Sequence, residues 1–384
     1  MRIVHIVRRF DPLLGGIERY VHGVATGQVL LGHEVTVVTL DRDVIHDRAG
    51  RLPARERIQG VDVVRLAGFG NRRYALCLRP DQMVRVLRSA DVIHQHDLRF
   101  MTGLVAMTAS ATGRPLIVHT HGLIFHTPWA GRLKRQTFRR YYGPLLRATA
   151  TRIIASSEPD REVLLEHAPY LESRTVVFEN ATDLEPFLQL ERRPQPGLIV
   201  TPGRLSRHKG LEDLLRATAQ LEPGAWTLEL SGPHDREERA RLQGIVAELG
   251  IGDRVNFTGI YTDQQHLERL QRAAMCVFPS EHEGFGFALL EGMAAGVPLL
   301  ARDIPAHRSV LGPDLTDRLV RIQRPADLAL AIERQLSETA AQDGVLSTRL
   351  RRRSLDFDIG RLLRQLEELY SLLHPARAHA GGSS

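Results

Sequence analysis

Residues 198–220 read LIVTPGRLSRHKGLEDLLRATAQ and hold, in order, a short strand, a glycine-bearing turn and a helical stretch. The strand is the apolar, β-branched run 198–201, and apolar residues recur at helical spacing over 211–220. The turn between them carries Arg204 and Lys209, and it leads into the amino terminus of the helix, where backbone N–H groups favour an anion. The stretch therefore predicts an α/β unit with a phosphate site in its turn.

The same alternation of short strands and helical stretches continues on both sides of this unit. Expected strands are 3–7, 34–39, 61–66, 91–94, 115–119, 152–155 and 175–178, then 198–201, 226–230, 255–258, 275–278, 297–300 and 319–322. Expected helices of the first half are 17–30, 80–89, 99–110, 132–149 and 158–167. Proline and charge interrupt both periodicities within 185–197, which indicates a linker. The pattern predicts two Rossmann-like, doubly wound parallel-sheet domains that face each other across a cleft.

These boundaries give an N-terminal domain over 1–185 and a C-terminal domain over 197–355. A terminal amphipathic helix is expected within 356–375 and is expected to pack back on the N-terminal domain. The small-residue tail 376–384 is expected to be disordered.

Composition excludes several classes of protein. A chain of 384 residues exceeds the ~250 to 300 residues of one core, and 43% hydrophobic with 25% charged residues is typical of packed domains. No apolar run reaches the ~18 residues of a spanning helix, and the amino terminus lacks the pattern of a signal peptide. Cys77 and Cys276 lie in unrelated contexts, which indicates neither a disulfide framework nor a thiolate metal site. We expect a cytoplasmic protein.

Lysine is rare in this chain. Of the 51 basic residues 49 are arginine, and the two lysines are Lys134 and Lys209. A lysine kept against such a bias suggests a need for a compact ammonium group, whereas Arg204 offers a planar fork for a phosphate edge. Residues 1–190 hold 26 basic and 19 acidic side chains, so the positive excess lies in the first half.

A second glycine-bearing turn, 279–287, follows a strand and precedes the helical run 288–296. Gly284 and Gly286 let the backbone approach a ligand closely, but without a third glycine they are a poor dinucleotide fingerprint. Glu283 precedes the turn, and Glu291 lies in an apolar helical run where a buried carboxylate needs a partner such as a sugar hydroxyl. We expect these two carboxylates to lie at different ends of one phosphate-bearing ligand.

Together these motifs resemble the retaining glycosyltransferases of the GT-B fold, in the glycosyltransferase 4-like family with a Glu-x7-Glu motif. The resemblance rests on Gly203-Arg204 with Lys209-Gly210, and on Glu283-Gly284-Phe285-Gly286 with Glu291 eight positions after Glu283. Supporting pieces are Gly15-Gly16-Ile17-Glu18, Asp91 to His94, and His121-Gly122. The resemblance covers residues 3 to about 311. One departure is Asn180-Ala181-Thr182-Asp183, where the family often has glycine at the second position.

The resemblance implies a nucleoside-diphosphate-sugar donor as substrate, no further cofactor and no metal ion. Arg204 and Lys209 would bind the diphosphate, and Glu291 would bind the ribose hydroxyls. The donor sugar would be bound by Glu283 together with the backbone of Gly284, Phe285, Gly286 and Phe287. Gly15 and Gly16 would meet the phosphate, His121 the reacting sugar, and Tyr261 the base. It further implies front-face attack, in which a donor phosphate oxygen takes the acceptor proton and no protein nucleophile is needed.

Other patterns leave alternatives open. His94-x-His96 and His119-x-His121 place histidines on one face of a strand, as in metal sites, so a metal-dependent hydrolase is the competing enzyme. Asp41-Arg42-Asp43 resembles a metal-binding Asp-x-Asp, but it lacks a matching donor architecture and we interpret it as a loop. A basic protein that binds phosphate or nucleic-acid backbones without catalysis is the second alternative.

The stretch Trp129 to Arg147 holds six cations, four aromatic rings and no acid. On a helix it would form a basic amphipathic surface for an anionic membrane, or an ordinary solvated helix with its aromatics in the core. Pro144 is expected to end or kink the helix. The acceptor is then a glycan, a lipid or a small molecule, and the protein is either wholly cytoplasmic or peripheral at the inner face of a membrane.

Overall fold

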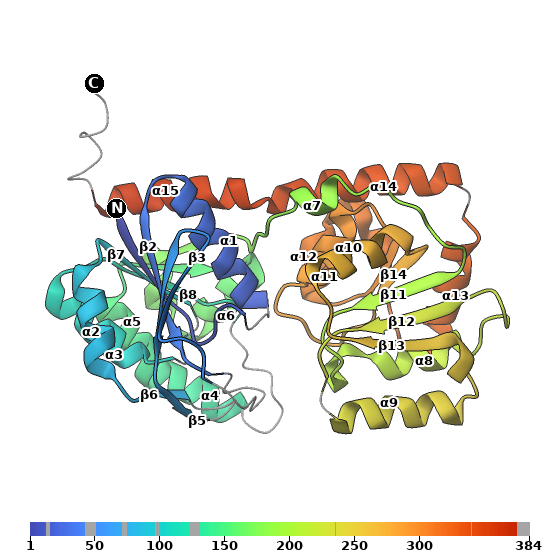
Figure 1. The fold of residues 1–384 in the computed structure, drawn as a ribbon, viewed down its shortest axis with the longest axis horizontal. Coiled ribbons are helices and arrows are strands. Elements are labelled where there is room, and N and C mark those ends of the chain that lie inside the picture. Colours follow the sequence, from blue (N-terminus) through green and yellow to red (C-terminus); the bar gives the residue numbers. More distant parts are fainter. Residues whose placement is uncertain are drawn as a thin grey trace. The chain divides into compact units, whose positions relative to one another are not determined.

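The computed structural model describes residues 1–12, 16–42, 51–70, 75–96, 98, 100–122, 131–234, 236–338 and 340–374. It divides into two compact units, each built on its own sheet (Figure 1). Unit 1 holds Met1–Thr182 together with the chain from Ile359 onward, and unit 2 holds Asp183–Asp358.

Within its described residues unit 1 has an eight-stranded sheet in the order β10-β9-β8-β7-β1-β2-β4-β3. Its strands are β1 (Arg2–Ile6), β2 (Glu34–Leu40), β3 (Arg55–Ile58), β4 (Val61–Leu66), β7 (Val92–His96), β8 (Leu116–His119), β9 (Arg152–Ala155) and β10 (Thr175–Val177). All pairings are parallel except β3 with β4. A small antiparallel hairpin joins β5 (Gly68–Gly70) to β6 (Ala75–Cys77).

Helices cover both faces of this sheet. They are α1 (Gly16–Leu30), α2 (Pro80–Ser89), α3 (Thr102–Thr112), α4 (Gly131–Thr137), α5 (Gly143–Thr149), α6 (Glu158–His167) and α15 (Ile359–Leu373). Alternate residues of β1 separate the two faces, because Val4 and Ile6 join the apolar core beneath α2 and α3 while His5 contacts Gln28 of α1. The face that carries His5 is therefore the one beneath α1.

The last helix, α15, packs against α1 (Figure 1). Its buried stripe is Leu362, Leu366, Leu369 and Tyr370, the spacing of one helix face. Gly27 of α1 lets the two helices approach closely, since a Cβ there would lie 2.4 Å from Leu363 Cδ1. The end of the chain thus completes unit 1.

Unit 2 has a six-stranded parallel sheet in the order β13-β12-β11-β14-β15-β16. Its strands are β11 (Leu198–Pro202), β12 (Thr227–Ser231), β13 (Val255–Gly259), β14 (Met275–Phe278), β15 (Leu299–Arg302) and β16 (Leu319–Val320). Its helices are α7 (Glu185–Leu188), α8 (Leu211–Thr218), α9 (Arg236–Glu248), α10 (Asp263–Arg272), α11 (Phe287–Ala294), α12 (Pro305–Leu311), α13 (Pro325–Leu336) and α14 (Ala340–Ser354). Separate apolar cores fill its two faces, one with α11 and α14 and the other with α8, α9 and α13.

The stretch that the sequence suggested as a linker packs into unit 2. Leu184 is fully buried in the core beside α11, and Phe187, Leu188 and Leu190 pack against that core. Proline and charged residues interrupt the periodicity here, but the apolar side chains between them are still buried against the core of unit 2. The polar edge strand β3 was not predicted, because its residues Arg55–Ile58 alternate only between exposed and partly exposed positions.

From residue 131 to residue 149 the chain forms one helical run, which continues past Pro144. A π-helical turn, Phe138–Tyr142, joins α4 to α5, and the N–H of Gly143 bonds the carbonyl of Phe138. Pro144 has no N–H to donate and sits in the first turn of α5, where that loss costs little. Among the described residues, none of the helices has the length and apolar character needed to cross a bilayer.

Candidate functional site

In both sheets the strand order reverses at one point, and ligands of open α/β sheets bind beside the carboxyl ends of strands at such a point. In unit 2 the chain runs outward from β11 through β12 to β13, then returns to β14 on the other side of β11. In unit 1 the reversal lies between β1 and β7. A site is therefore expected in the loops that follow β11 and β14 in unit 2 and β1 and β7 in unit 1.

The loops after β11 and β14 touch each other in unit 2. The N–H of Glu281 donates to the carbonyl of His208 at 2.9 Å, and Gly210 lies directly against Pro279. Gly210 has φ +62°, and a Cβ there would lie 2.1 Å from the Pro279 carbonyl oxygen. The guanidinium of Arg302 donates to the same oxygen at 2.8 Å. Only glycine at 210 allows the two predicted turns to form one site.

Gly210→Ala is expected to destabilise unit 2 by at least about 2 kcal/mol, because alanine disfavours this backbone conformation and its methyl group would overlap the Pro279 carbonyl. Thermal unfolding measures the loss. Gly244→Ala is the matched control, since a Cβ at 244 meets nothing within 4 Å. Equal melting temperatures for the two variants would contradict the close approach of the turns.

Lys209 and Glu283 join the two turns by an ion pair. The Lys209 Nζ donates to Glu283 Oε1, and the buried Ser280 hydroxyl donates to the same oxygen at 2.9 Å. Burial acts to raise the pKa of Glu283, but the Lys209 charge and the two hydrogen bonds outweigh it and hold the pKa below its usual value. Glu283 is therefore ionised at neutral pH. Two residues predicted from separate motifs thus form one charged pair.

The other predicted residues of these two turns lie close to this pair in the sequence. Arg204 is half-buried in the loop after β11, and Gly203 beside it has φ +123° with its Cβ position 3.9 Å from Lys209 Nζ. Gly286 has φ +107° and precedes Phe287, the first residue of α11. Gly284 is exposed on the same loop. The amides at the start of α11 therefore directly follow the loop that carries Glu283, whose partner Lys209 lies in the turn after β11.

Phe285 serves the core as well. Its side chain is 6% exposed and packs edge-on against Phe287 and Phe357 at centroid distances of 5.0 and 5.5 Å. Its side chain is therefore held in the core, and its backbone is the part that the resemblance assigns to the donor sugar.

Glu291 lies in the middle of α11 and is buried, with 3% of the residue exposed. Its Oε2 accepts a hydrogen bond of 2.9 Å from Nε2 of the buried His266, on α10. The Tyr261 ring stacks on His266 with centroids 5.1 Å apart, and the Arg269 guanidinium lies over the Tyr261 ring, 5.1 Å from its centroid. Glu291 thus meets α10, which follows β13, whereas Glu283 meets the turn after β11.

The sequence missed His266 and Ser280. We expected sugar hydroxyls to satisfy the buried Glu291, and the protein itself supplies a donor in His266. His266 is the fourth residue of a polar helix, α10, and carries no motif of its own. The only available signal was the need of a buried carboxylate for a partner.

In unit 1 five histidines gather beneath α1 and α15. Strand pairing places His5 of β1 beside His94 of β7, and His96 of β7 beside His119 of β8. His121 follows β8, so the histidine cluster extends to the carboxyl ends of these strands. Both pairs noted in the sequence thus share one face with His5, which carried no pattern of its own.

These imidazoles form hydrogen bonds and stacks. His5 Nε2 lies 2.7 Å from Gln28 Oε1, His5 Nδ1 lies 2.9 Å from His96 Nε2, and His96 Nδ1 lies 2.9 Å from His121 Nε2. His119 stacks on His121 with centroids 3.9 Å apart, and Tyr20 meets His121 edge-on at 4.9 Å. Burial lowers the pKa of His5 from 6.5 to about 4 and lowers the pKa values of His94, His96 and His119 well below 6.5.

Two groups of these nitrogens lie close enough to suggest a metal site, namely His5 with His94 and His96, and His96 with His119 and His121. Within each group the ligand atoms lie within 4.8 Å of one another, and both groups consist of histidines alone. However, nitrogens facing each other at 2.9 Å share one proton in a hydrogen bond. The same nitrogens therefore form a hydrogen-bonded network in this structure.

The remaining predicted residues are less informative. Gly16 begins α1, in whose first turn Glu18 pairs with the buried Arg9 at 3.0 Å. Gly15, Asp43 and Trp129 lie outside the described residues. Asp41 is buried and accepts a hydrogen bond of 2.9 Å from the backbone N–H of Gly68.

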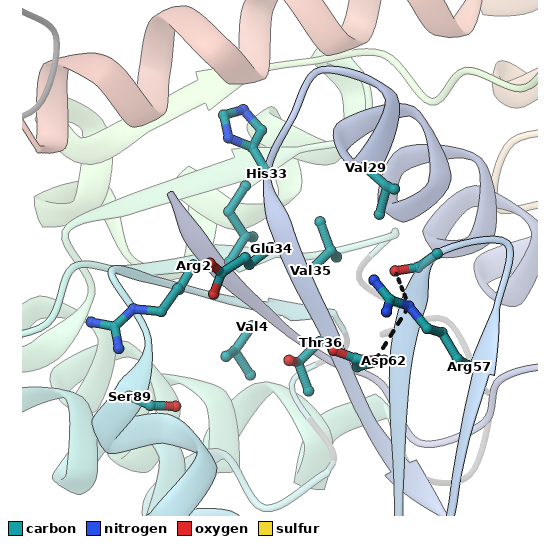
Figure 2. Close-up of a pocket in the computed structure, with 12 residues that line it drawn as sticks. Arg2, Val4, Val29, His33, Glu34, Val35, Thr36, Arg57, Asp62 and Ser89 are labelled. Carbon is teal, nitrogen blue, oxygen red and sulfur yellow. Dashed lines mark hydrogen bonds and ion pairs between the residues drawn. The ribbon is translucent and has the colours of Figure 1, made fainter. Parts of the chain in front are cut away.

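A cavity of about 360 Å³ lies at the opposite edge of the unit 1 sheet (Figure 2). It is lined by the starts of β1 and β2, including Arg2, Glu34 and Thr36, and by Arg57 and Asp62, whose charged groups lie 3.7 Å apart. Because it adjoins the amino ends of the strands, it does not belong to the site at their carboxyl ends.

Comparison with known proteins identifies both halves of the chain. Residues 15–181 match the model described as "Glycosyl transferase 4-like domain", and residues 187–351 match "Glycosyl transferases group 1". A GDP-mannose:cellobiosyl-diphosphopolyprenol alpha-mannosyltransferase of Xanthomonas campestris is 34% identical over 346 residues, 87% of this chain and 88% of that protein. A protein of the same name from Komagataeibacter xylinus is 30% identical over 80% of this chain and 77% of its own. Among solved structures, a sucrose-phosphate synthase from Thermosynechococcus elongatus has a TM-score of 0.76 at 23% identity, covering 98% of this chain and 99% of its own, a likeness of fold alone.

Proposed function

The chain belongs to the glycosyltransferase 4-like, group 1 family of the GT-B fold and uses nucleotide-sugar donors, and we propose that it transfers mannose from GDP-mannose to a saccharide carried on a polyprenyl diphosphate. The transfer retains the anomeric configuration and needs no metal ion. The comparisons do not favour the hydrolase or the nucleic-acid-binding alternative.

The observation that carries this proposal is the Lys209–Glu283 pair, which ties the turn after β11 to the start of α11 at the strand-order reversal of unit 2. Arg204 and Lys209 would hold the diphosphate, and Glu283 with the amides of Gly286 and Phe287 would hold the donor sugar. Glu291 would accept hydrogen bonds from the ribose hydroxyls, with Tyr261 beside the base. The two glutamates have different partners, Lys209 for Glu283 and His266 for Glu291, which supports such an extended ligand.

The chemistry follows from where charge develops. When the glycosidic bond to the diphosphate breaks, negative charge grows on the phosphate oxygens, and fixed cations stabilise that charge in the transition state. A donor phosphate oxygen takes the proton of the attacking hydroxyl, which attacks on the face that the diphosphate leaves. Glu283 is ionised and bonded by Lys209 and Ser280, which suits a sugar-binding carboxylate rather than a proton donor.

The choice of donor and acceptor rests on the relatives. Three relatives named GDP-mannose:cellobiosyl-diphosphopolyprenol alpha-mannosyltransferase are 30 to 36% identical to this chain over 79 to 87% of its length. Their names give both GDP-mannose as donor and a polyprenyl diphosphate as carrier.

A panel of nucleoside diphosphates and their sugars tests the donor. We expect GDP and GDP-mannose to raise the melting temperature more than UDP or ADP compounds, since a ligand at 100 times its Kd adds about 2.7 kcal/mol to stability. Mannose transfer to a polyprenyl-diphosphate disaccharide should continue in EDTA, and product NMR should show the donor's anomeric configuration. Stabilisation by UDP-sugars alone would contradict the donor, and a rate restored only by added metal would contradict metal independence.

We further propose that the helical run 131–149 docks on an anionic membrane surface, where a polyprenyl-linked acceptor would be found. Leu133 and Tyr141 are 67% and 51% exposed, and Arg132, Arg139 and Arg140 are exposed on the same run. Phe138 and Leu146 are buried and anchor the run to unit 1. Phe138 thus belongs to the core, whereas Tyr141 and Leu133 are exposed on a run that also exposes arginines, as in an interfacial helix.

Liposome flotation tests the membrane surface. Replacing Arg132, Arg139 and Arg140 together by glutamine is expected to weaken binding to vesicles with anionic lipid roughly 100-fold at low salt, because each cation near such a surface contributes about 1 kcal/mol. The matched control replaces the exposed Arg321, Arg324 and Arg334 of unit 2 by glutamine, with the same change in charge. Equal loss in both variants would show an effect of net charge and not of this helix.

A further inference from the structure

The unit 1 histidines contain a continuous hydrogen-bonded chain from Gln28 to His121. It runs from Gln28 Oε1 to His5 Nε2 at 2.7 Å, from His5 Nδ1 to His96 Nε2 at 2.9 Å, and from His96 Nδ1 to His121 Nε2 at 2.9 Å. Gln28, His5 and His96 are fully buried, with no exposed surface. None of these three residues was assigned a role in the predicted donor site.

The chemistry of the chain gives it one direction. The Oε1 of Gln28 can only accept a hydrogen bond, so His5 carries its proton on Nε2 and donates it to Gln28. Burial lowers the pKa values of His5 and His96, so each ring is neutral and holds one proton. Nδ1 of His5 must then accept from Nε2 of His96, and Nδ1 of His96 must accept from Nε2 of His121.

We propose that Gln28, acting through His5 and His96, fixes His121 as its Nε2–H tautomer, so that Nδ1 is the nitrogen that accepts a hydrogen bond from a hydroxyl of the bound sugar. This inference rests on the proposed role of His121 beside the reacting sugar. Gln28, His5 and His96 are positioning residues, since they act on the substrate only through His121.

The backbone and the neighbouring rings of His121 are built for the same purpose. His121 has φ +50°, a conformation that costs a non-glycine residue energy and persists where surrounding contacts impose it. Stacking on His119 and the edge contact with Tyr20 hold the ring plane, while the bond to His96 selects its protonated nitrogen. Orientation and tautomer are thus set by different partners.

The test reads the tautomer directly, with ¹⁵N-histidine-labelled full-length protein and long-range ¹H–¹⁵N spectra, the His121 signals being assigned by their loss in His121→Gln. We expect Nε2–H in the wild type. Gln28→Glu keeps an acceptor at this position and should keep that tautomer, whereas Gln28→Met removes the acceptor and should give a mixture. His5→Gln interrupts the chain one step nearer and should also give a mixture, which covers the case that Gln28→Met fails to fold.

Transfer kinetics complete the test. Gln28→Met is expected to lower kcat by about 10- to 100-fold with little change in KM for the donor, and Gln28→Glu to restore most of the rate. Val105→Ala removes a buried side chain from the opposite face of the sheet and controls for loss of stability alone.

The outcomes separate the two proposals. An Nδ1–H tautomer of His121 in the wild type would overturn the positioning chain, whatever the enzyme transfers. The same holds if the wild-type tautomer of His121 stays unchanged in both Gln28→Met and His5→Gln. A changed tautomer with an unchanged rate would overturn its part in catalysis. Wild-type protein that fails to bind or transfer any nucleotide sugar would instead contradict the proposed function. The spectra would still test the hydrogen-bonded chain from Gln28 to His121.

Discussion

Lys209→Ala is expected to lower kcat for sugar transfer by about 100- to 1,000-fold, the usual cost of removing one fixed group that stabilises developing negative charge. Lys209 ends the turn after β11 and pairs with Glu283, so its ammonium lies where the donor diphosphate and sugar would meet. Because the charge develops only as the bond breaks, the loss should fall on kcat more than on donor affinity. Single-turnover transfer measures it directly.

Arg207→Ala is the matched control, because Arg207 lies in the same turn with its side chain 75% exposed. Its removal changes the net charge equally and should leave kcat close to that of the wild type. Lys209→Ala also leaves the partly buried Glu283 with Ser280 as its remaining side-chain donor among the described residues, at an expected cost in stability of about 1 to 3 kcal/mol. Lys209→Arg keeps the charge, so partial activity in that variant would support a charge effect. Full activity in Lys209→Ala would remove this residue from the mechanism.

Glu291→Ala is expected to raise KM for the donor by about 100-fold or more, with a smaller effect on kcat. A carboxylate that accepts hydrogen bonds from ribose hydroxyls binds a part of the donor that does not react, and each such bond contributes about 1.5 to 3 kcal/mol. The variant should also lose most of the thermal stabilisation by GDP, because ribose is common to donor and product. Donor titration and thermal shift measure the two effects separately.

Removal of Glu291 also leaves the buried His266 without its acceptor, so the unliganded protein should melt at a lower temperature. Glu291→Gln keeps an acceptor oxygen for His266 at nearly the same volume and should recover stability more than affinity. Glu281→Ala, an exposed carboxylate of the neighbouring loop, controls for the loss of one negative charge. Unchanged GDP binding in Glu291→Ala would show that Glu291 serves only to hold His266.

Much of the candidate donor site could be proposed from the sequence, because its residues are close in sequence to the features that position them. Arg204 and Lys209 follow a strand and precede a helix, and Glu283 precedes Gly286 at the start of α11. The doubly wound fold followed from the same local alternation. The resemblance to glycosyltransferases depended on those motifs as well, and the comparisons support it.

Side-chain partners from distant parts of the chain could not be predicted in this way. His266 carries no motif, and it meets Glu291, 25 residues away, because α10 and α11 lie near one another in the folded unit. Pro144 looked like a helix end, but a π-helical turn before it let the helix continue.

The sequence by itself determined the two sheets, the glycines that let the turns form and the charged residues those turns carry, because strand and helix periodicity and backbone conformation are local properties. Only the tertiary structure decided which of these groups meet. It joined Lys209 to Glu283 across 74 residues and brought His5 of β1, His96 of β7 and His121, which follows β8, into one hydrogen-bonded chain. Hydrogen bonds and ion pairs act over a few ångströms, and strand order, which no local pattern specifies, decides which loops come within that distance.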